Sequence, residues 1–203
     1  AEMRELLERY SYGRTPDVKV KVRAENITFE RYDFAGKCTH ERLTLVYEGD
    51  KKKGEFPIQI FTPSSVEHPP VFLHIGFSLA PHWYIPVEEI IDAGYALVVV
   101  DYRDMVNDNH HGDFSGGISA FFGTTDKRKK DEWGKIGMWA YGASRILDYL
   151  MTREDIDAAH TAVIGHSRLG KTALWAGAND ERFTHVFSND SGCSGAALTR
   201  MKV

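Results

Sequence analysis

Cysteine is scarce in this sequence, because Cys38 and Cys193 are the only two among 203 residues. Two cysteines cannot form the disulfide framework of a small secreted domain, although a single bridge between them is possible. The chain also has no apolar run close to the roughly 20 residues that a membrane-spanning helix needs. We therefore expect a fold that is stabilised by a hydrophobic core, and no membrane partner.

An excess of basic residues is also absent. The chain has 25 Lys and Arg residues against 29 Asp and Glu residues, which gives a net charge of −4. Proteins that bind nucleic acids usually present a basic face, so we expect no nucleic-acid partner. The first residues, AEMRELLERY, are charged and lack the apolar core of a signal peptide. A mature secreted chain and a cytosolic chain would both look like this, which leaves the compartment open.

The order of the predicted elements indicates the fold class. The length fits one sizeable domain, and alternating β-branched residues predict several strands before strand–helix alternation begins. The predicted strands span residues 20–34, 41–49, 55–63, 71–77, 95–102, 160–167 and 184–190. The predicted helices span residues 1–10, 83–93, 131–154 and 168–178. This order is typical of an α/β fold with a mixed, mostly parallel sheet flanked by helices.

Residues 103–131 form a long polar connection that contains several glycines and the charge run DKRKKDE. The connection is too long for an ordinary loop, which predicts a functional or mobile segment. It includes His110 and His111 in the stretch NDNHHGD, beside acidic residues. Adjacent side chains point in different directions and rarely bind one ion together, so we expect a polar loop near a site entrance and no metal site.

The stretch VIGHSRLGK, residues 163–171, predicts a strand, a sharp turn and a helix, with Ser167 at the turn. In α/β-hydrolases the nucleophilic serine occupies such a turn in the pattern G-x-S-x-G. Gly165 has the expected place, but the second glycine, Gly170, follows the serine by three residues. A serine that only caps a helix after a strand gives a similar pattern. The spacing alone leaves both interpretations of Ser167 open.

Two cationic residues beside Ser167 favour the catalytic interpretation. Ser167 and Lys171 are four residues apart, so they share one face at the start of the helix. Arg168 places a guanidinium with several donors next to the hydroxyl, and donors aimed at an oxyanion usually make the largest contribution to catalysis. The alternative is that both cations only solvate a helix surface, which fits poorly with the apolar residues around them.

The segments GHSRLGK, TALWAGANDERF and SNDSGCSGAALTR together resemble the glucuronoyl esterases, carbohydrate esterase family 15, and in particular their bacterial branch. The serine turn of that family has the form G-C-S-R-x-G-K, in which the glycine is displaced in the same way. His166 stands here in place of the cysteine. The resemblance is strongest over residues 94–200, and it implies an α/β-hydrolase fold.

The resemblance also implies an activity and a set of site residues. It implies a serine esterase that hydrolyses esters of (4-O-methyl-)glucuronic acid in glucuronoxylan or lignin–carbohydrate linkages through an acyl-enzyme, without a metal or an organic cofactor. Ser167 would be the nucleophile, Arg168 an oxyanion stabiliser, and Lys171 a donor to hydroxyls of the uronic acid. Asp190 would be the acid of the triad, where many members have glutamate, although an aspartate there could equally form a turn. Secretion is the expectation that follows from the family.

The sequence leaves two alternative functions open. The first is an acetyl xylan esterase or a general carboxylesterase on the same fold, which would prefer acetyl esters. The second is an inactive relative that binds carbohydrate, whose affinity would not depend on Ser167.

A histidine base is missing from its expected place. The chain order in α/β-hydrolases is serine, acid, histidine, and no histidine follows Asp190. His185 is expected at the start of a strand, far from the turn, and His166 is expected to point away from Ser167. We therefore expect the base outside this chain. Residues 1–203 are interpreted as the N-terminal part of a catalytic domain that a C-terminal remainder completes.

Several other residues have expected places. Gly76 and Phe77 are candidates for the second oxyanion donor, because hydrolases take this donor from the loop after the corresponding strand. Arg145 and Asp148 are expected to form a structural ion pair. The large aromatic residues on the predicted helices are expected in the core and not as carbohydrate platforms. They are Trp133, Trp139, Tyr141 and Trp175.

Overall fold

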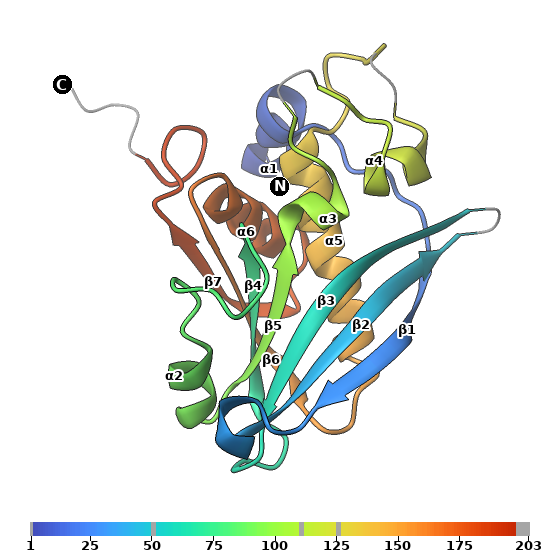
Figure 1. Ribbon diagram of the computed structural model, residues 1–203. Helices are drawn as coiled ribbons and strands as arrows, with labels where there is room; N and C mark the ends of the chain where they lie inside the picture. Colours follow the sequence, from blue (N-terminus) through green and yellow to red (C-terminus); the bar gives the residue numbers. More distant parts are fainter. Residues whose placement is uncertain (1, 50–51, 110–111, 125–126, 198–203) are drawn as a thin grey trace.

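A computed structural model shows one mixed sheet with helices on both faces (Figure 1). The structure describes residues 2–49, 52–109, 112–124 and 127–197. Over these residues the sheet has seven strands, in the order β1-β2-β3-β5-β4-β6-β7. The strands are β1 (Lys21–Glu30), β2 (Cys38–Glu48), β3 (Lys53–Pro63), β4 (Pro70–Gly76), β5 (Ala96–Asp101), β6 (Asp157–His166) and β7 (Phe183–Asn189). The helices are α1 (Glu2–Leu7), α2 (Val87–Asp92), α3 (Tyr102–Met105), α4 (Gly117–Phe122), α5 (Lys135–Leu150) and α6 (Arg168–Asn179), with single turns at Glu8–Tyr12 and Asp33–Gly36.

The sheet has an antiparallel half and a parallel half, as the order of the elements predicts. Strands β1, β2, β3 and β5 pair antiparallel, whereas β5, β4, β6 and β7 pair parallel. Every residue of β5 is buried, because this strand is central and helices cover both of its faces. A strand in that position requires a continuous apolar run, which is why LVVV stands there without alternation.

Helices cover the two faces of the sheet unequally. Figure 1 shows α5 and α6 on one side of the sheet and the short α2 on the other. Val98 and Val100 belong to the large core under α5 and α6, whereas Leu97 and Val99 belong to the small core under α2. Trp133, Trp139, Tyr141 and Trp175 all lie in the large core, which confirms their expected place, although Trp133 precedes α5 and is not on a helix. Arg145 and Asp148 form the expected ion pair, at 2.7 Å.

The α2 side also carries uncovered apolar surface over β4, β6 and β7. A hollow of about 530 Å³ lies there, and we call it the apolar hollow. Its lining includes Phe72, His74, Phe77, Tyr84, Ile90, Leu97, Ile164 and His166. Burial lowers the pKa of His74 to about 4, which keeps this ring neutral near pH 7. Phe187, on β7 beside this hollow, is 45% exposed.

The structure differs from the predicted elements in the long polar connection. This connection begins with α3 and contains α4, and neither helix was predicted. Helices of four and six residues are too short to show a helical period in sequence. The following helix also begins later than predicted, at Lys135, because Gly134 is still extended.

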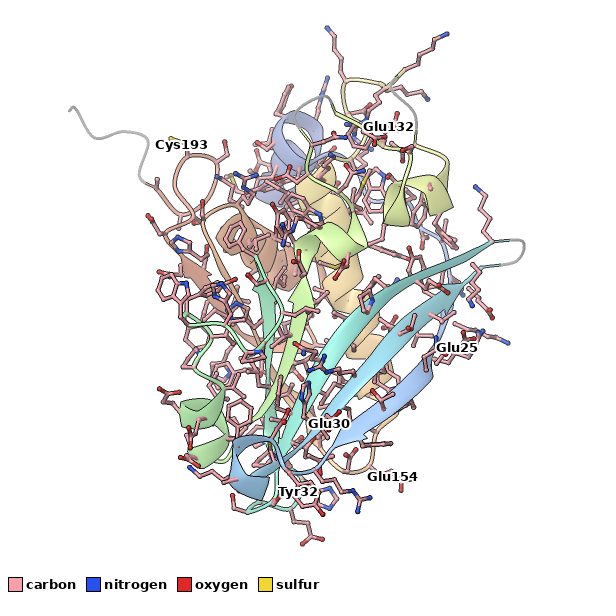
Figure 2. The ribbon with its side chains drawn as sticks, viewed as in Figure 1. Glu25, Glu30, Tyr32, Glu132, Glu154 and Cys193 are labelled. Carbon is pink, nitrogen blue, oxygen red and sulfur yellow. The ribbon has the colours of Figure 1, made fainter. Side chains whose placement is uncertain are left out.

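The two cysteines are not bridged, which makes the single disulfide considered above wrong. Cys38 is buried, and Cys193 is exposed on the loop that follows β7, at the opposite end of the molecule from Tyr32 (Figure 2). Among the described helices, none combines the length and the apolar character that crossing a membrane requires.

Candidate active site

Ser167 lies at a sharp turn between β6 and α6, at the carboxyl edge of the parallel strands. Its backbone has φ 55° and ψ −123°, a conformation that residues other than glycine rarely adopt. Its backbone N–H donates to the Asn189 carbonyl at 2.9 Å, which ties the turn to β7. A helix cap has an extended backbone and a hydroxyl that accepts a hydrogen bond from the helix. The Ser167 hydroxyl makes no such bond, so the cap interpretation is wrong and the strained turn of a nucleophilic serine fits.

Both glycines of the serine turn, residues 165–170, are required by close backbone contacts. A Cβ atom on Gly165 would lie 2.2 Å from the carbonyl oxygen of Leu169. A Cβ atom on Gly170 would lie 2.6 Å from the carbonyl oxygen of Asn189, at the end of β7. Leu169, two residues after the serine, points into the core and is fully buried. The second glycine is therefore displaced because the third position after the serine, and not the second, faces the backbone of β7.

Substituting Gly165 tests this packing. We expect Gly165→Ala to lower the free energy of unfolding by about 3 kcal/mol or more, because the new methyl group meets backbone and not a flexible side chain. Urea unfolding followed by circular dichroism measures the change. Gly116→Ala is the matched control, since its Cβ would have only an ordinary contact at 3.9 Å. Equal stability of the two variants would contradict the argument.

Arg168 and Lys171 open onto one side of a cleft of about 560 Å³, which we call the cationic cleft. The N-terminal segment, the start of α5 and the loop after β7 complete it. Its lining residues are Tyr10, Ser11, Tyr12, Asp108, Gly134, Lys135, Ile136, Trp139, Arg168, Lys171, Cys193 and Ser194. Burial lowers the pKa of Lys135, while the nearby Asp108 carboxylate opposes this shift. Three cations, hydroxyl groups and aromatic rings suit an oxygen-rich ligand.

Asp190 lies where the sequence predicts it, directly after the last residue of β7. Asn189 pairs with His166 in the parallel ladder, so Asp190 and Ser167 follow partnered residues at the same edge of the sheet. Asp190 is exposed and has a positive φ of 44°. This position would allow the carboxylate to face a histidine that approaches the edge. The catalytic role of Asp190 stays a prediction.

Neither histidine near the serine turn is placed as a base. His166 is exposed, its Nδ1 lies 3.2 Å from the Asn189 side-chain nitrogen, and it lines the apolar hollow and not the cationic cleft. His185 is the third residue of β7, and it lies toward the start of that strand as expected. Within the described ranges, no hydrogen bond joins a histidine to the Ser167 hydroxyl. A base from outside this chain stays the prediction.

Phe77 lies on the loop after β4, and both its backbone N–H and its backbone carbonyl have hydrogen-bond partners. The Phe77 N–H donates to the Tyr84 hydroxyl at 2.8 Å, so it is already engaged. The Phe77 carbonyl accepts from the Arg103 guanidinium at 2.9 Å, and Arg103 is held in turn by the buried Asp101 carboxylate. Phe77 could donate to an oxyanion only by giving up Tyr84. An oxyanion role for Gly76 or Phe77 therefore stays a prediction. At Phe77 the backbone N–H already donates to Tyr84.

Sequence reasoning missed the acidic residue at this site, Asp108. Its carboxylate accepts a hydrogen bond from the Arg168 guanidinium, across 60 residues of sequence. The signal that could have found it is its place soon after β5, because the carboxyl ends of parallel strands gather ligand-binding residues. His110 and His111 lie outside the described residues. Within the described ones, no group of three or more His, Cys, Asp or Glu side chains could hold a metal ion.

Comparisons with known proteins agree with this architecture. The model of the family described as "Glucuronyl esterase, fungi" matches residues 46–203. A carbohydrate esterase from an unknown prokaryotic organism is 31% identical over 242 residues, covering 99% of this chain and 55% of that protein. A glucuronoyl esterase structure from Solibacter usitatus has a TM-score of 0.84 at 31% identity, covering 98% of this chain and 59% of that one. A 4-O-methyl-glucuronoyl methylesterase from Hypocrea jecorina is 28% identical over 99% of this chain and 39% of its own length.

These matches fix the family and the fold. The chain spans about half the length, or less, of the curated relatives it matches. Its sheet and its serine turn are those of an α/β-hydrolase, which confirms the expected fold class. Because the family model covers most of the chain and the prokaryotic relative aligns along nearly all of it, this chain belongs to the glucuronoyl esterases, carbohydrate esterase family 15.

Proposed function

We propose that the protein is a serine esterase that hydrolyses esters of (4-O-methyl-)glucuronic acid in glucuronoxylan or lignin–carbohydrate linkages. The observation that carries this proposal is the strained turn of Ser167, with Arg168 and Lys171 opening onto one cleft. A uronic acid ester offers a carbonyl carbon to the serine and several hydroxyls to the cations. An apolar acyl chain would offer the cations nothing. The name of the Hypocrea relative, a 4-O-methyl-glucuronoyl methylesterase, supports this substrate class.

In this proposal Ser167 Oγ attacks the ester carbonyl carbon of the uronic acid and gives its proton to a histidine. The carbonyl oxygen becomes an oxyanion, which accepts hydrogen bonds from the Arg168 guanidinium and from N–H groups at the start of α6 that lack helical partners. The bond to the alcohol breaks, and the alcohol takes the proton from the histidinium. A water molecule gives a proton to the same histidine and attacks the acyl-enzyme. The uronic acid is released, and Ser167 recovers its proton.

The histidine would come from a segment of the protein outside residues 1–203, and Asp190 would orient it. Two observations support this part of the proposal. The curated relatives are longer than this chain, which spans 55% of the prokaryotic one and 39% of the Hypocrea one. The apolar hollow and the exposed Phe187 beside it also offer a surface on which a further segment could pack. Residues 1–203 are in this view one part of a catalytic domain.

Lys171 provides a test of the substrate class. We expect Lys171→Ala in the full-length protein to raise KM for a methyl glucuronate ester about tenfold with kcat little changed, because a donor to substrate hydroxyls is lost. Hydrolysis of acetylated xylan should change much less. Lys130→Ala, which removes an exposed lysine outside the cleft lining, is the control. Little effect of Lys171→Ala on the glucuronate ester, with faster turnover of acetyl esters, would favour the acetyl xylan esterase or general carboxylesterase alternative.

A further inference from the structure

Arg168 has to be held in place before it can stabilise an oxyanion. Its side chain is 52% exposed, and a long arginine chain in water samples many rotamers. Donors lower a barrier most when they are already aimed at the position where charge develops. A second group must therefore hold the guanidinium, and the described contacts of Arg168 identify it.

The group that holds Arg168 is the Asp108 carboxylate. It accepts a hydrogen bond from Nη1 of Arg168, which leaves the Nε and Nη2 hydrogens of the fork for another acceptor. Asp108 is 20% exposed and lines the same cleft as Arg168 and Lys171. A carboxylate on this side of the guanidinium fixes its direction and keeps its remaining donors available.

The segment that carries Asp108 is anchored by hydrogen bonds at three consecutive residues, Val106, Asn107 and Asp108. The Val106 carbonyl accepts from the Trp139 indole N–H at 3.0 Å. The Asn107 amide oxygen accepts from Lys135 Nζ at 3.2 Å.

Asp108 itself accepts from the hydroxyl of the buried Tyr102 at 3.3 Å. Tyr102 packs edge-on against Trp139, at 4.9 Å between ring centroids. The position of the carboxylate is therefore set by the core and by the lining of the cleft, and not by Arg168 alone.

We infer that Asp108 is a positioning residue: it holds the Arg168 guanidinium in the cationic cleft so that the free donors meet the oxyanion. The inference rests on the proposed function, because Arg168 acts in catalysis only if Ser167 is the nucleophile. A purely structural role for the pair fits less well, since ion pairs this exposed contribute little to stability.

The test uses the full-length protein with two readouts. One is the rate of hydrolysis of a methyl glucuronate ester. The other is the rate at which a fluorophosphonate phosphonylates Ser167, because this probe reacts with activated serines regardless of which ester the enzyme hydrolyses. We expect Asp108→Ala to lower kcat and the phosphonylation rate between tenfold and a hundredfold, because a displacement of the guanidinium by about 1 Å can have an effect of this size. KM should change by less than about twofold. Asp108→Glu, which keeps a carboxylate, should recover part of the loss.

A double-mutant cycle with Arg168→Ala separates positioning from structure. When Arg168 is already absent, Asp108→Ala should change either rate by less than about twofold, because the two residues act as one unit. Asp148→Ala is the matched control, since the Arg182–Asp148 pair has similar exposure, 42% and 23%, and lies outside the cleft lining. It should leave both rates unchanged.

Each outcome separates the inference from the proposed function. Additive losses, or no loss in Asp108→Ala, would overturn the inference. Coupling in the phosphonylation rate without hydrolysis of the glucuronate ester would support the inference and overturn the proposed function. A wild-type Ser167 that fails to react with the fluorophosphonate would overturn both.

Discussion

Replacing Ser167 with alanine in the full-length protein should lower kcat for a methyl glucuronate ester by about 10⁴-fold or more. Removing the nucleophile of a serine triad has effects of this size, because no other group can form the acyl-enzyme. The strained backbone is imposed by the tie from Ser167 to Asn189 and by the two glycines, so alanine should keep the same turn. Steady-state hydrolysis measures the loss, and circular dichroism checks that the fold is unchanged.

Ser188→Ala is the matched control for this experiment. Its hydroxyl lies on neighbouring β7 and donates to the Gly170 carbonyl at 2.9 Å. Losing that bond should lower the free energy of unfolding by about 1 kcal/mol while kcat stays unchanged. If Ser167→Ala retained about a tenth of wild-type activity, a different nucleophile would have to exist, and the proposed mechanism would fail.

Replacing Arg168 with alanine should lower kcat by about 10²- to 10³-fold, with a smaller change in KM. Loss of one well-placed oxyanion donor has this effect in other hydrolases, since the charge that it stabilises develops mainly in the transition state. Arg168→Lys should recover only part of the loss. A lysine keeps the charge, but it lacks the planar fork that can contact Asp108 and the oxyanion together.

The same kinetic series decides what Arg168 contributes. Arg182→Ala removes an arginine of comparable exposure that pairs with Asp148 and Asp180, and it should leave kcat unchanged. A variant of Arg168 that raises KM and keeps the wild-type kcat would mean that this side chain binds the ground state as strongly as the transition state. That result would remove the oxyanion role from the account.

Much of the fold could be predicted from the sequence because its strands carry strong local signals. The continuous apolar run in β5 reflects burial on both of its faces. In β2 and β3 the alternation is only partial, because consecutive residues such as Val46 and Tyr47 are also buried. The two short helices α3 and α4 could not be predicted. They depend on local contacts, such as the Asp101 carboxylate that accepts from the Arg103 N–H at the start of α3.

The site was less accessible to sequence reasoning, because two of its features exist only in three dimensions. A capping serine and a nucleophilic serine have the same neighbours in sequence, and only the backbone angles of Ser167 separate them. Asp108 sits in a polar stretch that resembles any exposed loop, and its partner Arg168 is 60 residues away. The hydrogen bond from the Phe77 N–H to the Tyr84 hydroxyl likewise could not be predicted from the sequence, because it forms only in the folded structure.

The most direct test of the central claim compares two substrates on the full-length protein. The measurement is kcat/KM for the methyl ester of 4-O-methyl-glucuronic acid and for acetylated xylan, each with Ser167→Ala as the control. The account predicts serine-dependent cleavage that favours the glucuronate ester. Preference for the acetyl ester would contradict the proposed substrate, and no serine-dependent turnover of either would contradict the proposed esterase.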